Sequence, residues 1–242
     1  MTTAIRRPLF SIAAAAGALC LALTGAASAT GAPAEVTASP LSAAEAQVLR
    51  ATLAKFDVPV ATQDELIARA RAGQVWDAST TNAVPVSEER GVVKDGFEYD
   101  VKRFADGSVA YVGLEIPAVE QGGGPQGRAI SQCRYQSGSG YSNATGCQID
   151  GAWGTIFVGA INVGYTLVQG GSDQMIDGGY GFQRCVYPTS CSSPVRVSWK
   201  KSENSSAAYQ RWQADVSGGY LGSWNVWVQL NVGGDRAWQT NS

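Results

Sequence analysis

The segment from Ala207 to Trp238, AAYQRWQADVSGGYLGSWNVWVQLNVGGDRAW, decides the fold of the chain. Apolar and polar residues alternate with a period of two on both sides of a Gly-rich turn, which is typical of a β-hairpin. Pairing Val216 with Trp224 gives the hairpin one apolar face, interrupted only by Gln210, and one polar face. The apolar face is expected to pack on a core. Its members are Ala208, Trp212, Ala214, Val216, Trp224, Val226, Val228, Leu230 and Val232.

The polar face of this hairpin is the predicted ligand-binding surface. In the same register Arg211 faces Gln229 and lies diagonal to Trp227, within reach of a cation–π contact. An exposed aromatic ring among amides suits a glycan or a protein partner. In the alternative, Trp227 and Tyr209 form the platform on which the N-terminal helices dock. The predicted ligand-binding residues are Tyr209, Arg211, Asn225, Trp227, Gln229 and Asn231.

Other segments also have the composition of strands bounded by turn residues. Asp106-Gly107 indicates a hairpin turn between two of them. The last segment is expected to point Val195, Val197 and Trp199 inward. Together these segments predict a mainly β fold, an antiparallel β-sandwich of the immunoglobulin-like or jelly-roll-like kind. The predicted strand segments are 97–104, 109–116, 130–135, 147–150, 155–168, 174–187 and 195–200.

The N-terminal part predicts export followed by a short αα-hairpin. Arg6 and Arg7 precede an apolar run that ends in Ala27-Ser28-Ala29, the pattern of a cleaved signal peptide. Ser42 and Thr62 each stand three residues before a glutamate and are predicted to cap two helices. The predicted organisation is signal peptide 1–29, disordered leader 30–41, helical hairpin and irregular connector 42–87, β-hairpin 88–119, Gly-rich linker 120–128 and disulfide-stabilised β-sandwich 129–242. The first β-hairpin either stands apart or pairs with the later strands.

Composition excludes several kinds of chemistry. The chain of 242 residues has no histidine, which excludes Ser-His-Asp and Cys-His catalysis and removes the commonest zinc ligand. A net charge of −2 gives no electrostatic footprint for nucleic acid. We therefore expect no cofactor, no metal and no nucleic-acid partner, and no membrane span once the signal peptide is removed.

Four cysteines remain after signal-peptide removal, and in an exported chain they are expected to form disulfides. Three pairings are possible. Cys133 and Cys147 enclose a Gly/Ser-rich segment, and Cys185 and Cys191 enclose Val-Tyr-Pro-Thr-Ser. We expect these two local pairs.

Carboxylates are the remaining catalytic candidates. Asp173 and Asp177 flank a turn, and Asp150 precedes a glycine. A glycosidase needs two carboxyl groups about 5–9 Å apart. Aspartate beside glycine is more often a turn residue, however, and 173–177 lacks the oxygen spacing of a calcium loop.

The sequence resembles small secreted proteins of actinomycetes over most of its mature length. The resemblance rests on LIARARAGQVWDA (66–78), FADGSVAYV (104–112), the paired-cysteine β region and LNVGGDRAW (230–238). It implies secretion and a helical leader before a β-sandwich, and it implies no activity. Two hypotheses follow: a secreted, non-enzymatic module that binds a protein or glycan at the final hairpin, or a carboxylate-based hydrolase of extracellular or cell-wall polysaccharide.

Overall fold

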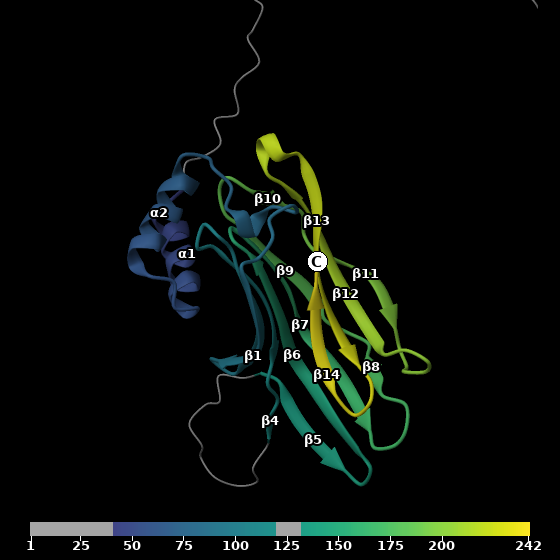
Figure 1. The fold of residues 1–242 in the computed structure, drawn as a ribbon. Helices are drawn as coiled ribbons and strands as arrows, with labels where there is room; N and C mark the ends of the chain where they lie inside the picture. Colours follow the sequence, from purple (N-terminus) through teal and green to yellow (C-terminus); the bar gives the residue numbers. More distant parts are fainter. Residues whose placement is uncertain (1–40, 120–131) are drawn as a thin grey trace, which may run out of the picture. The chain divides into compact units, whose positions relative to one another are not determined.

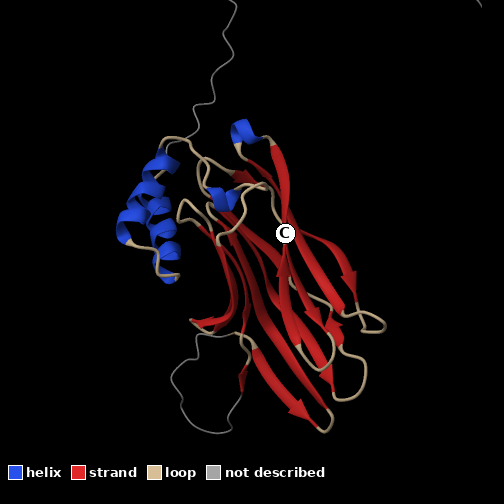
Figure 2. Ribbon diagram, viewed as in Figure 1, coloured by secondary structure: helices blue, strands red, loops and turns tan. Residues whose placement is uncertain are grey.

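Two β-sheets packed face to face form the body of the protein, and a pair of helices lies against one of them (Figure 1). The computed structural model describes residues 41–119 and 132–242. The predicted signal peptide, the leader up to Pro40 and the linker 120–128 lie outside the described residues. The predicted β-sandwich preceded by a helical hairpin is confirmed, and strands dominate the described chain (Figure 2).

The larger sheet, sheet A, has nine strands and the smaller, sheet B, has five. Sheet A follows the order β1-β2-β3-β6-β5-β4, and β7 pairs with β6, β8 and β9. Sheet B follows the order β10-β12-β13-β14, and β11 pairs with β12 beside β10. Sheet A consists of β1 (Ser87–Lys94), β2 (Phe97–Arg103), β3 (Val109–Glu115), β4 (Ala118–Val119), β5 (Arg134–Gly138), β6 (Tyr141–Trp153), β7 (Ile156–Val168), β8 (Gln174–Ile176) and β9 (Tyr180–Cys185). Sheet B consists of β10 (Ser190–Cys191), β11 (Val195–Lys200), β12 (Ala208–Ser217), β13 (Ser223–Val232) and β14 (Ala237–Asn241).

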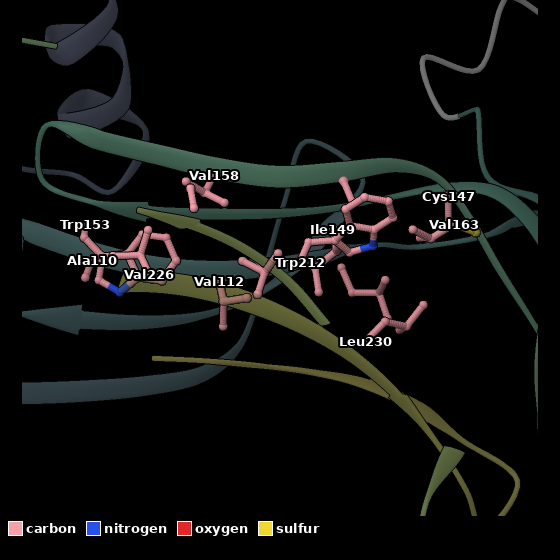
Figure 3. Packing of buried hydrophobic residues seen from close by; sticks show 14 of the residues in the cluster. Ala110, Val112, Cys147, Ile149, Trp153, Val158, Val163, Trp212, Val226 and Leu230 are labelled. Atoms are coloured by element: carbon pink, nitrogen blue, oxygen red, sulfur yellow. The ribbon is translucent and has the colours of Figure 1, made fainter. Parts of the chain in front are cut away.

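The final hairpin, β12–β13, has the predicted register, with Val216 opposite Trp224 and Arg211 opposite Gln229. Its apolar face packs against the inner faces of β3, β6 and β7 (Figure 3). Gln210 is fully buried on this face, and neither its amide nitrogen nor its amide oxygen has a hydrogen-bond partner among the described residues. The labelled core residues of Figure 3 are Ala110, Val112, Cys147, Ile149, Trp153, Val158, Val163, Trp212, Val226 and Leu230.

The helices cover the opposite face of sheet A. They are α1 (Ala43–Lys55) and α2 (Val60–Arg71), and short 3₁₀ turns follow at Asp77–Ser79 and Gly219–Leu221. The helices lie at one face of sheet A (Figure 1), and a second apolar cluster joins them to strands β2, β3, β6 and β7. The alternative of docking on Trp227 and Tyr209 is therefore wrong, because the outward residues of β2 and β3 supply the larger apolar surface. The cluster includes Leu49, Leu53, Phe56, Leu66, Ile67, Tyr99, Val101, Val109, Tyr111, Ala152 and Phe157.

The predicted capping of the helices is half right. Ser42 and Glu45 form the expected capping box at α1. The predicted cap at Thr62 is wrong, because α2 begins at Val60 after Pro59, whose φ of −57° already suits a helix start. The first β-hairpin pairs with the later strands, since β3 lies beside β6 in sheet A.

Both predicted disulfides are present. Cys133–Cys147 joins the segment before β5 to β6 within sheet A. Cys185–Cys191 joins the end of β9 to β10, so it links sheet A to sheet B at one side of the sandwich.

Two local predictions are wrong. The predicted strand segments 130–135 and 147–150 have the wrong bounds, because β5 and β6 pair through the Ser/Gly-rich segment between them and turn tightly at Gly140. The inward orientation predicted for Val195, Val197 and Trp199 also fails, and their exposed fractions are 59%, 46% and 39%. The reason is that β11 is an edge strand, and a register shift between Arg196 and Ser198 breaks the alternation of inward and outward side chains.

Candidate functional site

The outer face of sheet B gathers the six predicted ligand-binding residues on two adjacent strands. Their register places Tyr209 opposite Asn231, Arg211 opposite Gln229, and Asn225 opposite Asp215. The predicted cation–π contact is present, with the guanidinium carbon of Arg211 3.8 Å from the centre of the Trp227 ring. None of the described helices covers this face, since α1 and α2 pack on sheet A.

A ladder of hydrogen bonds fixes the middle of this surface. Arg211 Nε donates to Gln229 Oε1 (2.7 Å), and Gln229 Nε2 donates to Asn231 Oδ1 (2.6 Å). Asn231 Nδ2 in turn donates to Thr240 Oγ1 on β14 (3.1 Å). Gln229 and Asn231 are only 9% and 6% exposed, so their amides hold Arg211 in place and are not open to a ligand.

The structure adds a second aromatic–cation pair that the sequence analysis missed. Trp238 on β14 lies directly opposite Asn231 and therefore on the same outer face. Arg236 stacks on it, with the guanidinium carbon 4.9 Å from the ring centre. The sequence contains a signal for this strand, since Gly234-Asp235 is typical of a two-residue hairpin turn. In the structure both residues have positive φ, and β14 begins after them. We call Trp227, Arg211, Trp238 and Arg236 the Trp–Arg platform.

Several polar groups on this face have no described partner and are open to a ligand. The two terminal nitrogens of Arg211 form no hydrogen bond with a described residue, and the same holds for the whole guanidinium of Arg236. Asn225 is exposed beyond the ladder. Tyr209 is half-buried, and its hydroxyl accepts a bond from Ser198 Oγ (3.2 Å). The platform thus offers two indole rings and two guanidinium groups, and the hydrogen bond to Gln229 holds that of Arg211 in place.

A polar groove of about 680 Å³ borders the platform on the open side of the sandwich. The inward face of β2 forms its floor with Glu98, Asp100 and Lys102. Its two walls are the 88–91 part of β1 and the 236–241 part of the chain, which includes β14. Its volume falls in the usual range for ligand sites. These carboxylates were not predicted as site residues, because they lie on the first β-hairpin, whose position beside the final strands does not follow from the sequence.

The three candidate catalytic aspartates, Asp150, Asp173 and Asp177, lie apart, and each carboxylate has a structural role. The Asp173 carboxylate accepts bonds from the backbone N–H groups of Val168 and Asp235, which ties two turns together. Asp177 forms an ion pair with Arg196 at 2.7 Å. Asp150 lies on the helix-covered face of sheet A. No group of three metal-binding side chains occurs among the residues that the structure describes.

Asp150 belongs to a small polar cluster beneath α1. Tyr111 OH donates to Asp150 Oδ2 (3.4 Å), and Lys55 Nζ donates to the hydroxyl of Tyr99 (2.5 Å). Burial raises the pKa of Asp150 to about 6, against the opposing effects of nearby Lys55 and of the Tyr111 hydrogen bond. Burial also raises the pKa of Tyr111 well above its ordinary value. These groups contact the helices and have no described groove beside them, so they bear on stability.

Comparison with known proteins does not identify the function of this chain. No family model, curated protein or solved structure matches the chain. Both α-helices in the described part of the chain are too short and too polar to cross a membrane. The two disulfides fit an extracellular protein.

Proposed function

We propose that this chain is a secreted, non-enzymatic module that binds a glycan on the outer face of sheet B. The observation that carries the proposal is the Trp–Arg platform: two tryptophans, each stacked with an arginine, on a face that no described helix covers.

The chemistry of a sugar matches this surface. The apolar face of a pyranose ring packs on an indole ring, and its hydroxyl groups accept bonds from guanidinium N–H groups. The hydrogen-bond ladder holds Arg211 before any ligand arrives, which lowers the entropic cost of binding. Trp227 and Trp238 stand on neighbouring strands of one sheet, and their positions differ by four residues, about 13 Å, along the strands. The two rings therefore suit separate units of a longer glycan chain.

The experiment is a glycan array, followed by titration calorimetry of the strongest hits. Trp227→Ala and Trp238→Ala are each expected to weaken binding by about threefold to thirtyfold, since aromatic and cation–π contacts contribute about 0.5–2 kcal/mol. Trp199→Ala is the matched control. Trp199 also stacks with an arginine, Arg196 at 5.1 Å, but it lies on β11 outside the platform.

Two results would count against the proposal. One is an array without any hit. The other is equal weakening by Trp199→Ala and Trp227→Ala. Capture of a protein instead of a glycan, lost in the Trp227 variant, would keep the site and change the ligand class.

The second candidate function is a carboxylate-based polysaccharide hydrolase. Its support is that Glu98 and Asp100 project from one face of β2 into the groove. Residues two apart on a strand are about 7 Å apart, which allows the separations seen in glycosidases. Release of reducing sugar by the wild type, lost in both Glu98→Gln and Asp100→Asn, would establish this activity in place of simple binding.

A further inference from the structure

We propose that the groove between β1–β2 and β14 is a second binding site, which takes an extended peptide as an additional strand of sheet B. Its expected ligand has basic side chains at two alternate positions and an acidic side chain at the next alternate position. This site shares Trp238 and Arg236 with the Trp–Arg platform. It is argued from the edge of β14 and the charges of β2, and it does not depend on the glycan proposal.

The first observation is an open strand edge along the groove. Among the described strands, β14 pairs only with β13 and β1 only with β2. The backbone N–H of Gly233 donates to the carbonyl of Arg236, and that of Ser242 donates to the carbonyl of Trp227. Because hydrogen-bonded and non-bonded pairs alternate in an antiparallel ladder, the backbone groups of Ala237, Gln239 and Asn241 point away from β13. They form a row of donors and acceptors about 13 Å long.

The second observation is the position of this edge over sheet A. The side chain of Gln239 crosses from β14 to β2 and donates to the carbonyl oxygen of Glu98 (3.3 Å). The inward face of β3 is apolar and buried, with Ala110, Val112 and Leu114 inside the sandwich core. The inward face of the neighbouring β2 lines the groove. The groove thus occupies the place that a further strand of sheet B, beyond β14, would fill.

The third observation is the charge on the floor. Glu98, Asp100 and Lys102 alternate along β2 and share its inward face, while the residues between them, Tyr99 and Val101, are buried under the helices. Among the described residues, none of these three charged groups forms an ion pair. A ligand with charges of both signs would neutralise them, which favours a peptide over a neutral sugar.

The two-residue repeat of a β-strand relates the open edge of β14 to the charged residues of β2. A peptide that pairs with β14 presents every second side chain to β2, with the same repeat as Glu98, Asp100 and Lys102. Main-chain hydrogen bonds to β14 then supply affinity, and the three charges select a basic, basic, acidic pattern at alternate positions.

The test uses the folded, disulfide-bonded protein and a blocked peptide with lysine, lysine and glutamate alternating with valines. Titration calorimetry is expected to show binding that is at least tenfold tighter than for the peptide with every charge reversed. Glu98→Lys should weaken binding of the first peptide at least tenfold. Glu65→Lys, on the exposed side of α2, is the matched control and should have no effect. Trp227→Ala should also have no effect.

A second measurement tests strand addition on the wild-type protein. Methylating the backbone nitrogens of one alternating set of the peptide's residues should abolish binding, whereas methylating the other set should spare it. Equal effects of the two methylated peptides would overturn strand addition. Absence of binding up to about 1 mM, equal binding of the charge-reversed peptide, or a glycan whose binding is lost in Glu98→Lys but kept in Trp227→Ala would overturn the peptide site.

Discussion

Replacing Asp150 with asparagine should stabilise the protein at neutral pH, because the carboxylate is held beneath α1 in surroundings that disfavour its charge. Burial raises its pKa from 3.8 to about 6. A tenfold change in an ionisation equilibrium corresponds to about 1.4 kcal/mol, which sets an upper bound of about 3 kcal/mol on the effect. Asp150 as a whole residue is only half-buried. We therefore expect a gain of about 1–2 kcal/mol.

The sign of the pH dependence follows from proton binding. Between about pH 4 and pH 6 the folded state keeps the proton of Asp150, and the unfolded state has released it. Since the folded state binds more protons in this window, the free energy of unfolding falls as the pH rises. The contribution of the retained Asp150 proton to the free energy of unfolding is fully present below pH 4 and is lost above pH 6. Asp150→Asn removes this term, so its advantage should be near zero at pH 4 and largest at pH 7.

Urea unfolding at pH 4 and pH 7, followed by tryptophan fluorescence, measures the difference. Asp95→Asn is the matched control. Asp95 forms an ion pair with the same Lys55 whose charge acts on Asp150, but the Asp95 side chain is 74% exposed and its left-handed backbone suits asparagine. An advantage of Asp150→Asn that is the same at both pH values, or equal to that of Asp95→Asn, would refute the reasoning.

Three further predictions concern stability. Gln210→Met should raise the free energy of unfolding by about 1–2 kcal/mol, because the buried amide has no described partner; Gln213→Met on the half-exposed outer face should change it little, and urea melts of both variants decide. Replacing Cys185 and Cys191 with serine should cost about 2 kcal/mol by loop closure; an unchanged thermal midpoint would contradict this. A chain of residues 88–242 should fold but bind the dye ANS more than the chain of residues 30–242, because it exposes the helix-covered face of sheet A; failure to fold in circular dichroism would mean that the helices are needed for folding.

The parts of the fold that local patterns specify could be predicted from the sequence. In β12–β13 the strict alternation fixes which face is buried, and the register follows from it. The disulfides followed from short spacing between strand segments. The Ser42 capping box is likewise a local signal.

The remaining features depend on contacts that the sequence does not reveal. Strand β1 was not predicted because most of its residues are exposed and half of them are charged, although Asp95-Gly96 after it is a typical hairpin turn. The orientation of β11 depends on its being an edge strand.

Only part of the candidate site could be predicted, because some of its contacts also join strands that the sequence does not place together. Arg211 over Trp227 followed from the register of one hairpin. The burial of Gln229 and Asn231, the addition of Trp238 and the groove over β2 all depend on β14 and on how sheet B lies over sheet A.

The most direct test of the central claim is the indole N–H region of the NMR spectrum during titration with the strongest glycan of the array. The chain has seven tryptophans, and each contributes one indole signal. Assignment by single substitutions identifies the signals of Trp227 and Trp238. If the platform binds the glycan, these two signals shift on binding, and those of Trp199 and of Trp76, which is buried under the helices, do not. Shifts confined to Trp199, or no shift of Trp227 and Trp238 at saturation, would contradict the account.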